Sequence, residues 1–332
     1  MIRLSATSFI FAALLAALPA ARAADHVTFA TNWLAEAEHG GFYQAVADGT
    51  YAKFGLDVTI IQGGPNKNNA LMLAAGKVDF AMGLNMIEAF NAVANHVPVK
   101  VVAAEFQKDP QIFMSHPGVG LDHWRDLPKA TAYVSTMDQT SVWRWMAKSQ
   151  GFAATRTRPY NFNPAPFIAD KNSIQIGYVT SEPFAVEQAG HFKPNVFLLA
   201  DHGYQNYSTT IVARDDYIAS HADIVQRFVA ASALGWQHYL HGNPAAANAL
   251  IKKANPQMSD AQLAYSRQAL IRYGIVESGD ALKDGIGAMN AARIAEFYAK
   301  MVADHVVPAG LAVSGAYTLR FVNKGPTPAT AK

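Results

Sequence analysis

Apolar residues in the N-terminal quarter of the chain follow two alternating patterns. Short β-branched and apolar runs at residues 27–31, 58–61 and 78–82 have the length of strands. Between them, apolar side chains recur at helical spacing, first at Phe42, Ala45 and Val46 and then at Leu71, Met72 and Ala75. Strands that alternate with helices predict an α/β fold with mostly parallel sheets covered on both faces. Ligands bind such sheets at the carboxyl ends of the strands. The first candidate segments for a ligand site are therefore the three loops that follow these strands, at residues 32–43, 63–69 and 83–88.

The same patterns continue along the chain and divide it into two lobes. Further strands are predicted at residues 97–105, 111–115, 131–134, 158–162, 174–179, 196–199 and 208–213. Helices are predicted at 141–150, 222–240, 244–253, 259–273 and 286–303, and Ser259 with Gln262 has the spacing of a capping box. We assign residues 24–112 and 213–325 to the first lobe and 113–212 to the second, with crossovers near 111–116 and 207–213. Residues 326–332 have the composition of a flexible tail.

A secretory signal peptide is predicted at residues 1–23. Arg3 gives a basic start, residues 9–18 form an apolar run, and Ala21-Arg22-Ala23 is a small-x-small cleavage site. A membrane anchor is the alternative, but the apolar run is too short to span a bilayer. The mature chain is therefore expected to begin at Ala24 and to be exported.

Composition excludes several classes of chemistry. Removal of Arg3 and Arg22 lowers the formal net charge from +2 to zero, and no run of lysine or arginine predicts a nucleic-acid surface. The chain has no cysteine, so thiol catalysis, thiolate metal sites, iron–sulfur clusters and disulfides are excluded. His238 and His241 stand three residues apart without a third ligand nearby in sequence, which argues against a metal site. With no Gly-x-Ser-x-Gly, His-Glu-x-x-His or phosphate-loop motif, no catalytic residue and no cofactor is predicted.

Five short segments, in order across both predicted lobes, match a known family. They are Asn32-Trp33, residues 39–45 (His-Gly-Gly-Phe-Tyr-Gln-Ala), 54–58 (Phe-Gly-Leu-Asp-Val), 76–80 (Gly-Lys-Val-Asp-Phe) and 178–184 (Tyr-Val-Thr-Ser-Glu-Pro-Phe). The chain resembles the periplasmic substrate-binding proteins of ABC importers, in the branch related to binders of sulfonates and of thiamine-pyrimidine precursors. The resemblance implies a two-lobed periplasmic binding protein fold (type II) with two crossovers, closing on one small ligand. It also implies a periplasmic location and, as partners, a membrane permease and an ATPase, and we expect a monomer.

The same family has an enzyme branch, the eukaryotic thiamine-pyrimidine synthases. These share the region around His39 but carry a cysteine-rich iron-binding motif. Because the present chain has no cysteine and begins with an export signal, we predict a binding protein and not an enzyme.

Residues in the expected cleft loops are candidate ligand contacts. Gly40 and Gly41 begin a predicted helix, where backbone N–H groups can meet an anion or a carbonyl oxygen; close packing of the two glycines is the alternative. Trp33 follows the first strand and can stack on a planar ring, unless it is a core residue. His39 either contacts the ligand or is a structural histidine. The remaining polar and aromatic candidates are Asn32, Asn85, Thr136 and Tyr178.

The charges of these loops favour one class of ligand. Residues 32–43, 83–88, 135–141 and 178–184 contain no lysine or arginine, and their acids are Glu36, Glu38, Glu88, Asp138 and Glu182. Binding of a sulfonate or nitrate usually requires a guanidinium or ammonium group. A neutral or cationic nitrogen heteroaromatic fits better, with an amino group donating to Glu182 and its ring against Trp33 and Tyr178. Three hypotheses follow: a receptor for such a pyrimidine-like compound, a receptor for a sulfonate, nitrate or other small anion, and a pyrimidine-synthesising enzyme.

Overall fold

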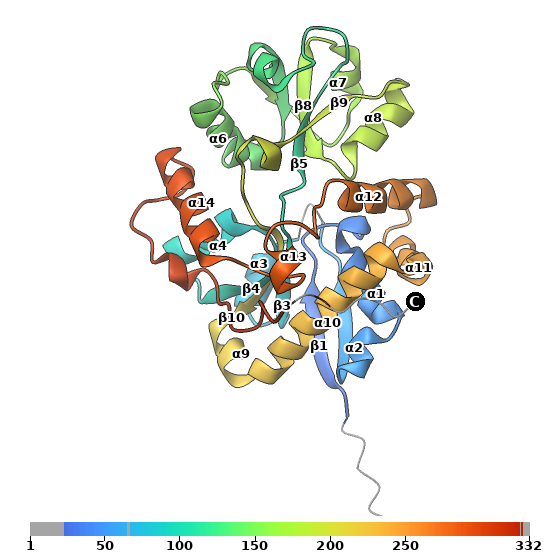
Figure 1. Cartoon of the computed structure of the whole chain (residues 1–332), viewed down its shortest axis with the longest axis vertical. Coiled ribbons are helices and arrows are strands. Elements are labelled where there is room, and N and C mark those ends of the chain that lie inside the picture. Colours follow the sequence, from blue (N-terminus) through green and yellow to red (C-terminus); the bar gives the residue numbers. More distant parts are fainter. Residues whose placement is uncertain (1–22, 65–66, 326, 328–332) are drawn as a thin grey trace, which may run out of the picture.

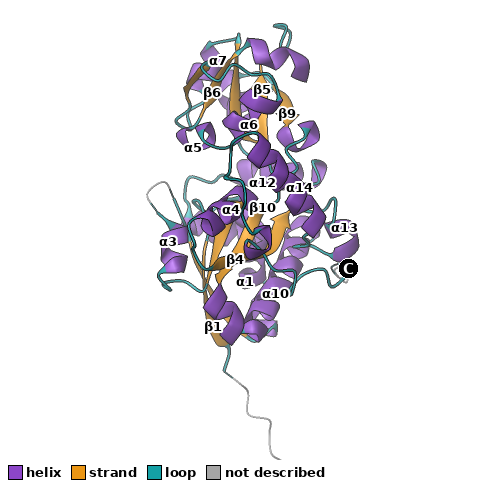
Figure 2. Ribbon diagram, turned by 90° about the vertical axis from the view of Figure 1, so that its left-hand side faces the viewer, coloured by secondary structure: helices purple, strands orange, loops and turns teal. Residues whose placement is uncertain are grey.

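Two α/β lobes are stacked along the long axis of the molecule and joined by two chain crossings (Figure 1). The structure, a computed structural model, describes residues 23–64, 67–325 and 327. Each lobe contains one five-stranded sheet with helices packed around it (Figure 2). Apart from Ala23 and Thr327, the predicted signal peptide and the predicted tail lie outside the described residues. Over the described ranges, none of the helices combines the length and the apolar character that a bilayer span requires.

The first sheet has the strand order β2-β1-β3-β10-β4. Its strands are β1 (Asp25–Ala30), β2 (Leu56–Ile61), β3 (Phe80–Asn85), β4 (Val99–Phe106) and β10 (Ser208–Arg214). β1 pairs in parallel with β2 and β3, with Val27 opposite Val58, and β10 runs antiparallel to both β3 and β4. Four of the five strands therefore share one direction, and β10 alone is reversed.

The second sheet repeats this plan in the order β7-β6-β8-β5-β9. Its strands are β5 (Gln111–Ser115), β6 (Thr131–Val134), β7 (Thr157–Pro159), β8 (Ser173–Tyr178) and β9 (Asn195–Leu198). β6 pairs in parallel with β7 and β8, and β5 runs antiparallel to β8 and β9. The prediction of two lobes with mostly parallel sheets is confirmed. In each lobe the reversed strand is the one that follows a crossing.

Helices surround both sheets. The first lobe contains α1 (Gly40–Ala47), α2 (Thr50–Lys53), α3 (Asn69–Ala74), α4 (Met86–Ala94), α9 (Asp215–Ser220), α10 (Ala222–His241), α11 (Ala245–Ala254), α12 (Asp260–Arg272), α13 (Ala281–Asp284) and α14 (Ala291–Ala303). The second lobe contains α5 (Thr136–Gln139), α6 (Val142–Ser149), α7 (Ala165–Ala169) and α8 (Glu182–Gly190). Short 3₁₀ helices are η1 (Ala37–His39), η2 (Trp124–Lys129), η3 (Leu199–His202) and η4 (Val313–Gly315).

The last long helix is shorter than predicted. Residues 286–303 were expected to be helical, but α14 begins at Ala291. Asn290 caps it by accepting hydrogen bonds from the backbone N–H groups of Ala292 (2.9 Å) and Arg293 (3.3 Å). Before the cap, Gly287 forms a bridge to Ala104 of β4, so this segment is a turn with a single bridge and not a helix.

Aromatic residues fix α1 and α10 on the first sheet. Phe29 of β1 packs on Phe42 of α1 and Phe228 of α10, with ring centroids 4.6 and 5.4 Å apart. Trp236 of α10 packs on Phe42 (5.9 Å) and on Phe106 of β4 (5.3 Å), and all five side chains are fully buried. Such pairs contribute about 0.5–1.5 kcal/mol each beyond the burial of their area. The carboxyl end of β1, where the candidate site begins, is therefore held rigidly.

The crossings lie at residues 107–110, between β4 and β5, and at residues 203–207, between η3 and β10. The sequence placed them a few residues later, at 111–116 and 207–213. Those runs are β5 and β10, and each pairs with strands on both of its sides inside a sheet. The second sheet accordingly starts at Gln111, and the return to the first sheet starts at Ser208.

One side chain of the first lobe holds both crossings. Arg293 of α14 donates to the carbonyl oxygen of Gln107 in the first crossing and to that of Gln205 (3.3 Å) in the second. Its guanidinium also lies 3.9 Å from the ring centre of Tyr207. The planar guanidinium has enough donors to serve several acceptors at once, so the two crossings are tied to the same point of the first lobe.

Candidate ligand site between the lobes

The loop after β8 joins the second lobe to the first. The carbonyl oxygen of Thr180 accepts hydrogen bonds from Gln262 Nε2 (3.0 Å) and Ser266 Oγ (2.6 Å) of α12, and the Thr180 hydroxyl donates to Glu38. Half of the predicted capping box is present, because Ser259 Oγ accepts from the Gln262 N–H (3.1 Å). The Gln262 side chain does not close the box and reaches the opposite lobe instead. The lobes are thus closed on each other beside the start of α12 (Figure 1).

Aromatic side chains from both lobes meet near this contact. Trp33, in the loop after β1, lies against Phe162, in the loop after β7, with ring centroids 5.3 Å apart. Tyr160 lies 5.5 Å from Phe162. Phe162 is 58% exposed and has a left-handed backbone (φ 59°), which is uncommon for a bulky side chain. These rings give the rim of the cleft apolar faces, and stacking of Trp33 on a ligand stays a prediction.

Glu182 is the first residue of α8, and its carboxylate folds back on its own lobe. Oε2 accepts from the Tyr178 N–H (2.7 Å) and the Ser181 hydroxyl (2.8 Å), and Oε1 accepts from the Tyr160 hydroxyl (3.1 Å). Gly177 is needed beside it, because a Cβ at that position would overlap the Glu182 side chain. Two carboxylate oxygens have about four lone-pair positions, so three donors fix the group and leave room for one more.

The charge of Glu182 acts on Glu36 and Glu38 of the first lobe. Burial raises the pKa of Glu38 to about 7; the Thr180 hydrogen bond opposes this shift, and the charge of Glu182 adds to it. Burial also raises the pKa of Glu36, and the charges of Glu38 and Glu182 raise it further. Carboxylates from both lobes therefore influence one another electrostatically, an arrangement that opposes any additional negative charge.

The floor of the cleft, at the first crossing, is also acidic. Asp109 is 1% exposed and accepts from the Gln111 N–H (3.1 Å) and Asn206 Nδ2 (3.4 Å), and burial raises its pKa to about 7. Asp138 accepts from Gln111 Nε2 (2.7 Å) and the Ser135 hydroxyl (2.5 Å), and burial raises its pKa as well. The amide oxygen of Gln111 is buried without a hydrogen-bond partner. The floor thus has one polar atom free beside two acids.

Tyr178 connects the floor with the acids of the rim. Burial raises the pKa of its hydroxyl, and the charges of Asp109, Asp138, Glu36 and Glu38 raise it further. These acids belong to the first crossing, the second lobe and the first lobe, so they surround one side chain. The phenol stays neutral and can offer a ligand a hydrogen-bond donor as well as a ring.

His39 is a buried, neutral histidine. Burial lowers its pKa to about 3. Nδ1 accepts from the Glu36 N–H (3.3 Å), which leaves the proton on Nε2 for Asn32 Oδ1 (3.1 Å). These bonds favour the structural alternative for His39, which orients Asn32. Ligand contact by Asn32 stays a prediction.

Gly40 and Gly41 allow two helices to approach closely. A Cβ at Gly40 would overlap the ring of Tyr239, and one at Gly41 would overlap the ring of Trp236, both on α10. The Gly40 N–H donates to the Ala37 carbonyl oxygen. The expectation that Gly40 offers a free N–H to a ligand is therefore wrong, and the glycine pair serves the packing of α1 on α10.

Asn85 and Thr136 lie where the chain leaves β3 and β6. Asn85 is 5% exposed, caps α4 by accepting from the Ile87 N–H (3.0 Å), and hydrogen-bonds to Asp109. Thr136 is exposed in the first turn of α5. Asn85 thus links the first lobe to the acidic floor. Ligand contact by either residue stays a prediction.

The sequence analysis missed Asp109, Tyr160, Phe162 and Gln262. Tyr160 and Phe162 follow β7, which ends at Pro159. Because the sequence placed this strand at residues 158–162, both side chains fell inside it and the rule that selected Trp33 passed over them. Asp109 lies in a crossing that the sequence placed a few residues later. Nothing in the local pattern identifies Gln262, because its cross-lobe contact depends on how the lobes meet.

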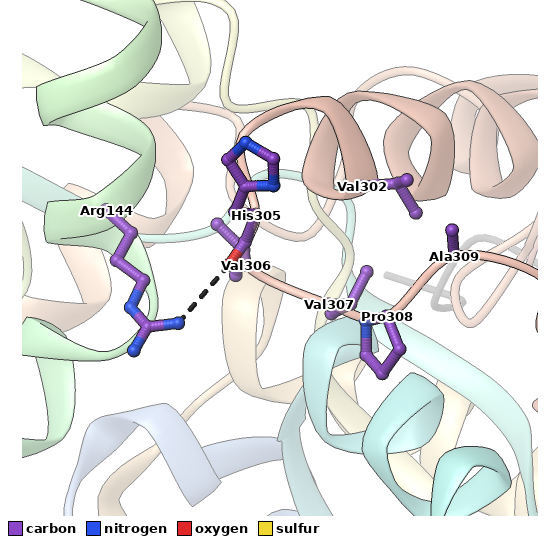
Figure 3. Close-up of a pocket in the computed structure, with 7 residues that line it drawn as sticks. All are labelled: Arg144, Val302, His305, Val306, Val307, Pro308 and Ala309. Atoms are coloured by element: carbon purple, nitrogen blue, oxygen red, sulfur yellow. Dashed lines mark hydrogen bonds between the residues drawn. The ribbon is translucent and has the colours of Figure 1, made fainter.

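A separate cavity of about 460 Å³ lies between α6 and the end of α14 (Figure 3). Its lining residues include none of the candidates above: Arg144, Val302, His305, Val306, Val307, Pro308 and Ala309. Arg144 Nη1 donates to the carbonyl oxygen of His305 (3.2 Å), as the dashed line in Figure 3 marks. Beside it, Ser149 Oγ donates to the carboxylate of Asp304 (2.7 and 2.8 Å). The lobes are therefore in contact on this side as well.

Comparison with known proteins gives a family and a relative. The family model described as NMT1/THI5 like matches residues 36–247. The riboflavin-binding protein RibY of Chloroflexus aurantiacus is 27% identical over 255 residues, which cover 74% of this chain and 71% of that protein.

Solved structures share the fold at low identity. The periplasmic aliphatic sulphonate binding protein SsuA from Escherichia coli has a TM-score of 0.67, 12% identity, and coverage of 89% of this chain and 92% of that chain. The desulfurization enzyme DSZB has a TM-score of 0.56, 13% identity, and coverage of 90% and 97%. The predicted periplasmic binding protein fold is confirmed. Because a binding protein and an enzyme both have this fold, function has to be argued from the cleft.

Proposed function

This chain belongs to the NMT1/THI5-like family, and we propose that it is the exported solute-binding protein of an ABC importer. The ligand is a small nitrogen heteroaromatic compound, like a thiamine-pyrimidine precursor, held between the two lobes. One observation carries the choice of ligand: the charges that most shift the pKa values of Glu36, Glu38, Asp138 and Tyr178 are all carboxylates. Amino groups and ring N–H groups donate to carboxylates, so such a ligand uses the groups that the cleft contains.

Planar rings on both sides of the cleft support the aromatic part of the proposal. Trp33 and Phe162 come from opposite lobes, and Tyr178 lies among the acids. Aromatic side chains bind planar rings through offset or edge-to-face contacts. The relative named as a riboflavin-binding protein has, by that name, a heteroaromatic ligand, which agrees with a flat nitrogen-containing compound here.

A sulfonate, nitrate or other small anion is the alternative ligand, and the name of the sulphonate-binding neighbour favours it. The electrostatics oppose it. Two like charges 4 Å apart repel by about 4 kcal/mol at an effective dielectric constant of about 20, and the cleft presents several carboxylates. An anion would have to be accompanied by protons on Glu38 and its neighbours.

Thermal unfolding of the mature protein tests the ligand class. An aminopyrimidine at about one hundred times its Kd should raise the unfolding free energy by about 2.7 kcal/mol, which corresponds to several degrees for a protein of this size. Riboflavin tests the larger heteroaromatic, and taurine and nitrate test the anion alternative. Stabilisation by taurine or nitrate without any by the heteroaromatics would contradict the proposal. Mass spectrometry of the copurified ligand would name the compound directly.

In this proposal the protein acts in the periplasm as a monomer, without enzymatic activity and without a cofactor. A membrane permease and its ATPase are the partners that accept the loaded protein. Secretion of the full chain should give a mature protein that begins at Ala24, which N-terminal sequencing measures. Ligand-dependent stimulation of ATP hydrolysis by the permease–ATPase complex in liposomes would identify the partners, and turnover of the ligand by the purified protein would count against a pure binding role.

A further inference from the structure

We propose that the ligand is an organic cation, whose positive charge lies between the carboxylates and the aromatic faces of the two lobes. The inference rests on the proposed heteroaromatic-binding function and specifies the charge of the bound compound. A neutral pyrimidine and a permanently charged nitrogen ring make different demands on a site. The geometry separates them through three features.

The first feature is a group of carboxylates from both lobes at the contact beside Thr180. The charge of Glu182 in the second lobe raises the pKa values of Glu36 and Glu38 in the first lobe, and no cation is among the causes of these two shifts. Lys67, on the nearby loop of the first lobe, is exposed and donates its ammonium protons to the Gln62 carbonyl oxygen (2.7 Å). Desolvated carboxylates without a counter-ion are costly, and a cationic ligand supplies the missing charge.

The second feature is the aromatic rim. Phe162 of the second lobe lies between Trp33 of the first lobe and Tyr160 of its own lobe, with ring centroids 5.3 and 5.5 Å away. Tyr160 also donates its hydroxyl proton to Glu182 (3.1 Å). The negative faces of such rings attract a cation, and aromatic cages hold quaternary ammonium groups in this way. The carboxylates and the ring faces therefore both favour a positively charged ligand.

The third feature is the Gln111 amide at the floor. Gln111 is 4% exposed, its Nε2 donates to Asp138 (2.7 Å), and its Oε1 is buried without a partner. A buried acceptor without a partner is costly, and an N–H or polarised C–H donor of a ligand would satisfy it. In the described part of the chain, no three His, Cys, Asp or Glu side chains are grouped so as to hold a metal ion. An organic cation agrees with both observations.

Isosteric ligand pairs that differ only in charge test the inference. Calorimetry at about pH 8 should compare 1-methylnicotinamide, a cation, with 3-methylbenzamide, its neutral isostere, and choline with 3,3-dimethylbutan-1-ol. We expect at least one cation to bind about 10-fold or more tightly than its neutral partner. Glu38→Gln should reduce that ratio, whereas Glu296→Gln, the same change on the exposed face of α14, should leave it unchanged. Trp33→Leu should weaken the cation more than the neutral partner.

The outcomes separate this inference from the proposed function. Tight binding of neutral aminopyrimidines, with no preference for a cation in either pair, would overturn the inference and keep the heteroaromatic receptor. Binding of taurine or nitrate alone would overturn both. Failure of both cations to bind at millimolar concentration would also overturn the inference. If Glu38→Gln does not fold, the wild-type pairs and Trp33→Leu still decide.

Discussion

Raising the pH should open the ligand-free cleft, because closure buries Glu38 against Thr180 of the opposite lobe. In the closed arrangement the pKa of Glu38 is raised from 4.5 to about 7. Opening the lobes separates the carboxyl from Thr180 and returns it to water, where its pKa is ordinary. The closed state therefore binds the proton more tightly than the open state. Closure gains its full contribution from this group below about pH 4.5 and loses it as the pH rises through about 7.

The size of the effect follows from the shift in pKa. Moving the pKa of Glu38 from 4.5 to about 7 corresponds to roughly 3 kcal/mol of preference for the protonated closed state. Linkage then predicts that the ratio of closed to open molecules falls by roughly 70-fold between about pH 5 and about pH 8 through this group alone. Asp109, whose pKa is also raised to about 7, adds to the same trend to the extent that opening exposes it.

The absence of cysteine makes the measurement direct. Spin labels at Leu71→Cys and Lys171→Cys, one exposed position on each lobe, report the distance between the lobes by double electron–electron resonance. In the wild-type protein, the distribution of distances between the two labels should be narrow at about pH 5, where the lobes are closed. At about pH 8 it should be broader and shifted, because the lobes open. At about pH 8 the fraction of molecules with closed lobes should be larger in Glu38→Gln than in the wild type, and this fraction should change little between the two pH values. Glu296→Gln should behave as the wild type. Identical distance distributions at both pH values would refute the reasoning, as would an unchanged pH response in Glu38→Gln.

Three further substitutions test other parts of the molecule. Gly41→Ala should lower the unfolding free energy by about 1–3 kcal/mol in urea denaturation, because the added Cβ has no space. Gly315→Ala, where a Cβ meets only ordinary contacts, is the control. An equal loss of unfolding free energy at both sites would contradict the packing argument. Arg293→Lys should lower the unfolding free energy by about 1–3 kcal/mol and broaden the distribution of distances between the spin labels on the two lobes, because lysine cannot bind both crossings at once. The control Arg320→Lys, at an exposed position, should change neither quantity. A narrow distance distribution in Arg293→Lys would contradict the role of Arg293 in holding both crossings. Glu182→Gln should weaken ligand binding by about 10- to 100-fold and lower the unfolding free energy by about 1–3 kcal/mol. The substitution replaces one carboxylate oxygen by an NH₂ group that faces the hydrogen-bond donors of Tyr160 and Tyr178. Wild-type affinity in calorimetry together with a lowered melting temperature would show that Glu182 only stabilises the start of the helix and the loop before it.

The fold could be predicted closely because local patterns determine most of its elements. The strand predicted at residues 131–134 is β6, with the same bounds, and the long helix predicted at 222–240 is α10 with one residue added. The helix predicted from residue 286 fails because Gly287 bridges to Ala104, a contact far away in sequence. The crossings were misplaced for a similar reason, since an extended run gives no local sign of which sheet it joins.

The site was predicted less well, because its chemistry depends on the meeting of the two lobes. Trp33 and Glu182 could be selected from their positions after strands. The pKa of Glu38 is raised by burial and partly lowered again by the hydrogen bond from Thr180 of the other lobe, and no pattern around Glu38 reveals either effect. A glycine pair at a helix start is common to anion sites and to close helix packing. Only the position of α10 shows that Gly41 packs against Trp236, and ligand contact by Gly41 stays a prediction.

Synthesis delivers the chain from its N-terminus, yet the first sheet cannot form in that order. β10 lies between β3 and β4, so both strands keep an unpaired edge until residues 208–214 have emerged. The strands of the second sheet, by contrast, all lie within residues 111–198 and can pair as soon as that stretch is free. The earlier strands must wait as open edges, which are the sites where chains most readily aggregate. The lobe that begins the chain is therefore the lobe that folds last.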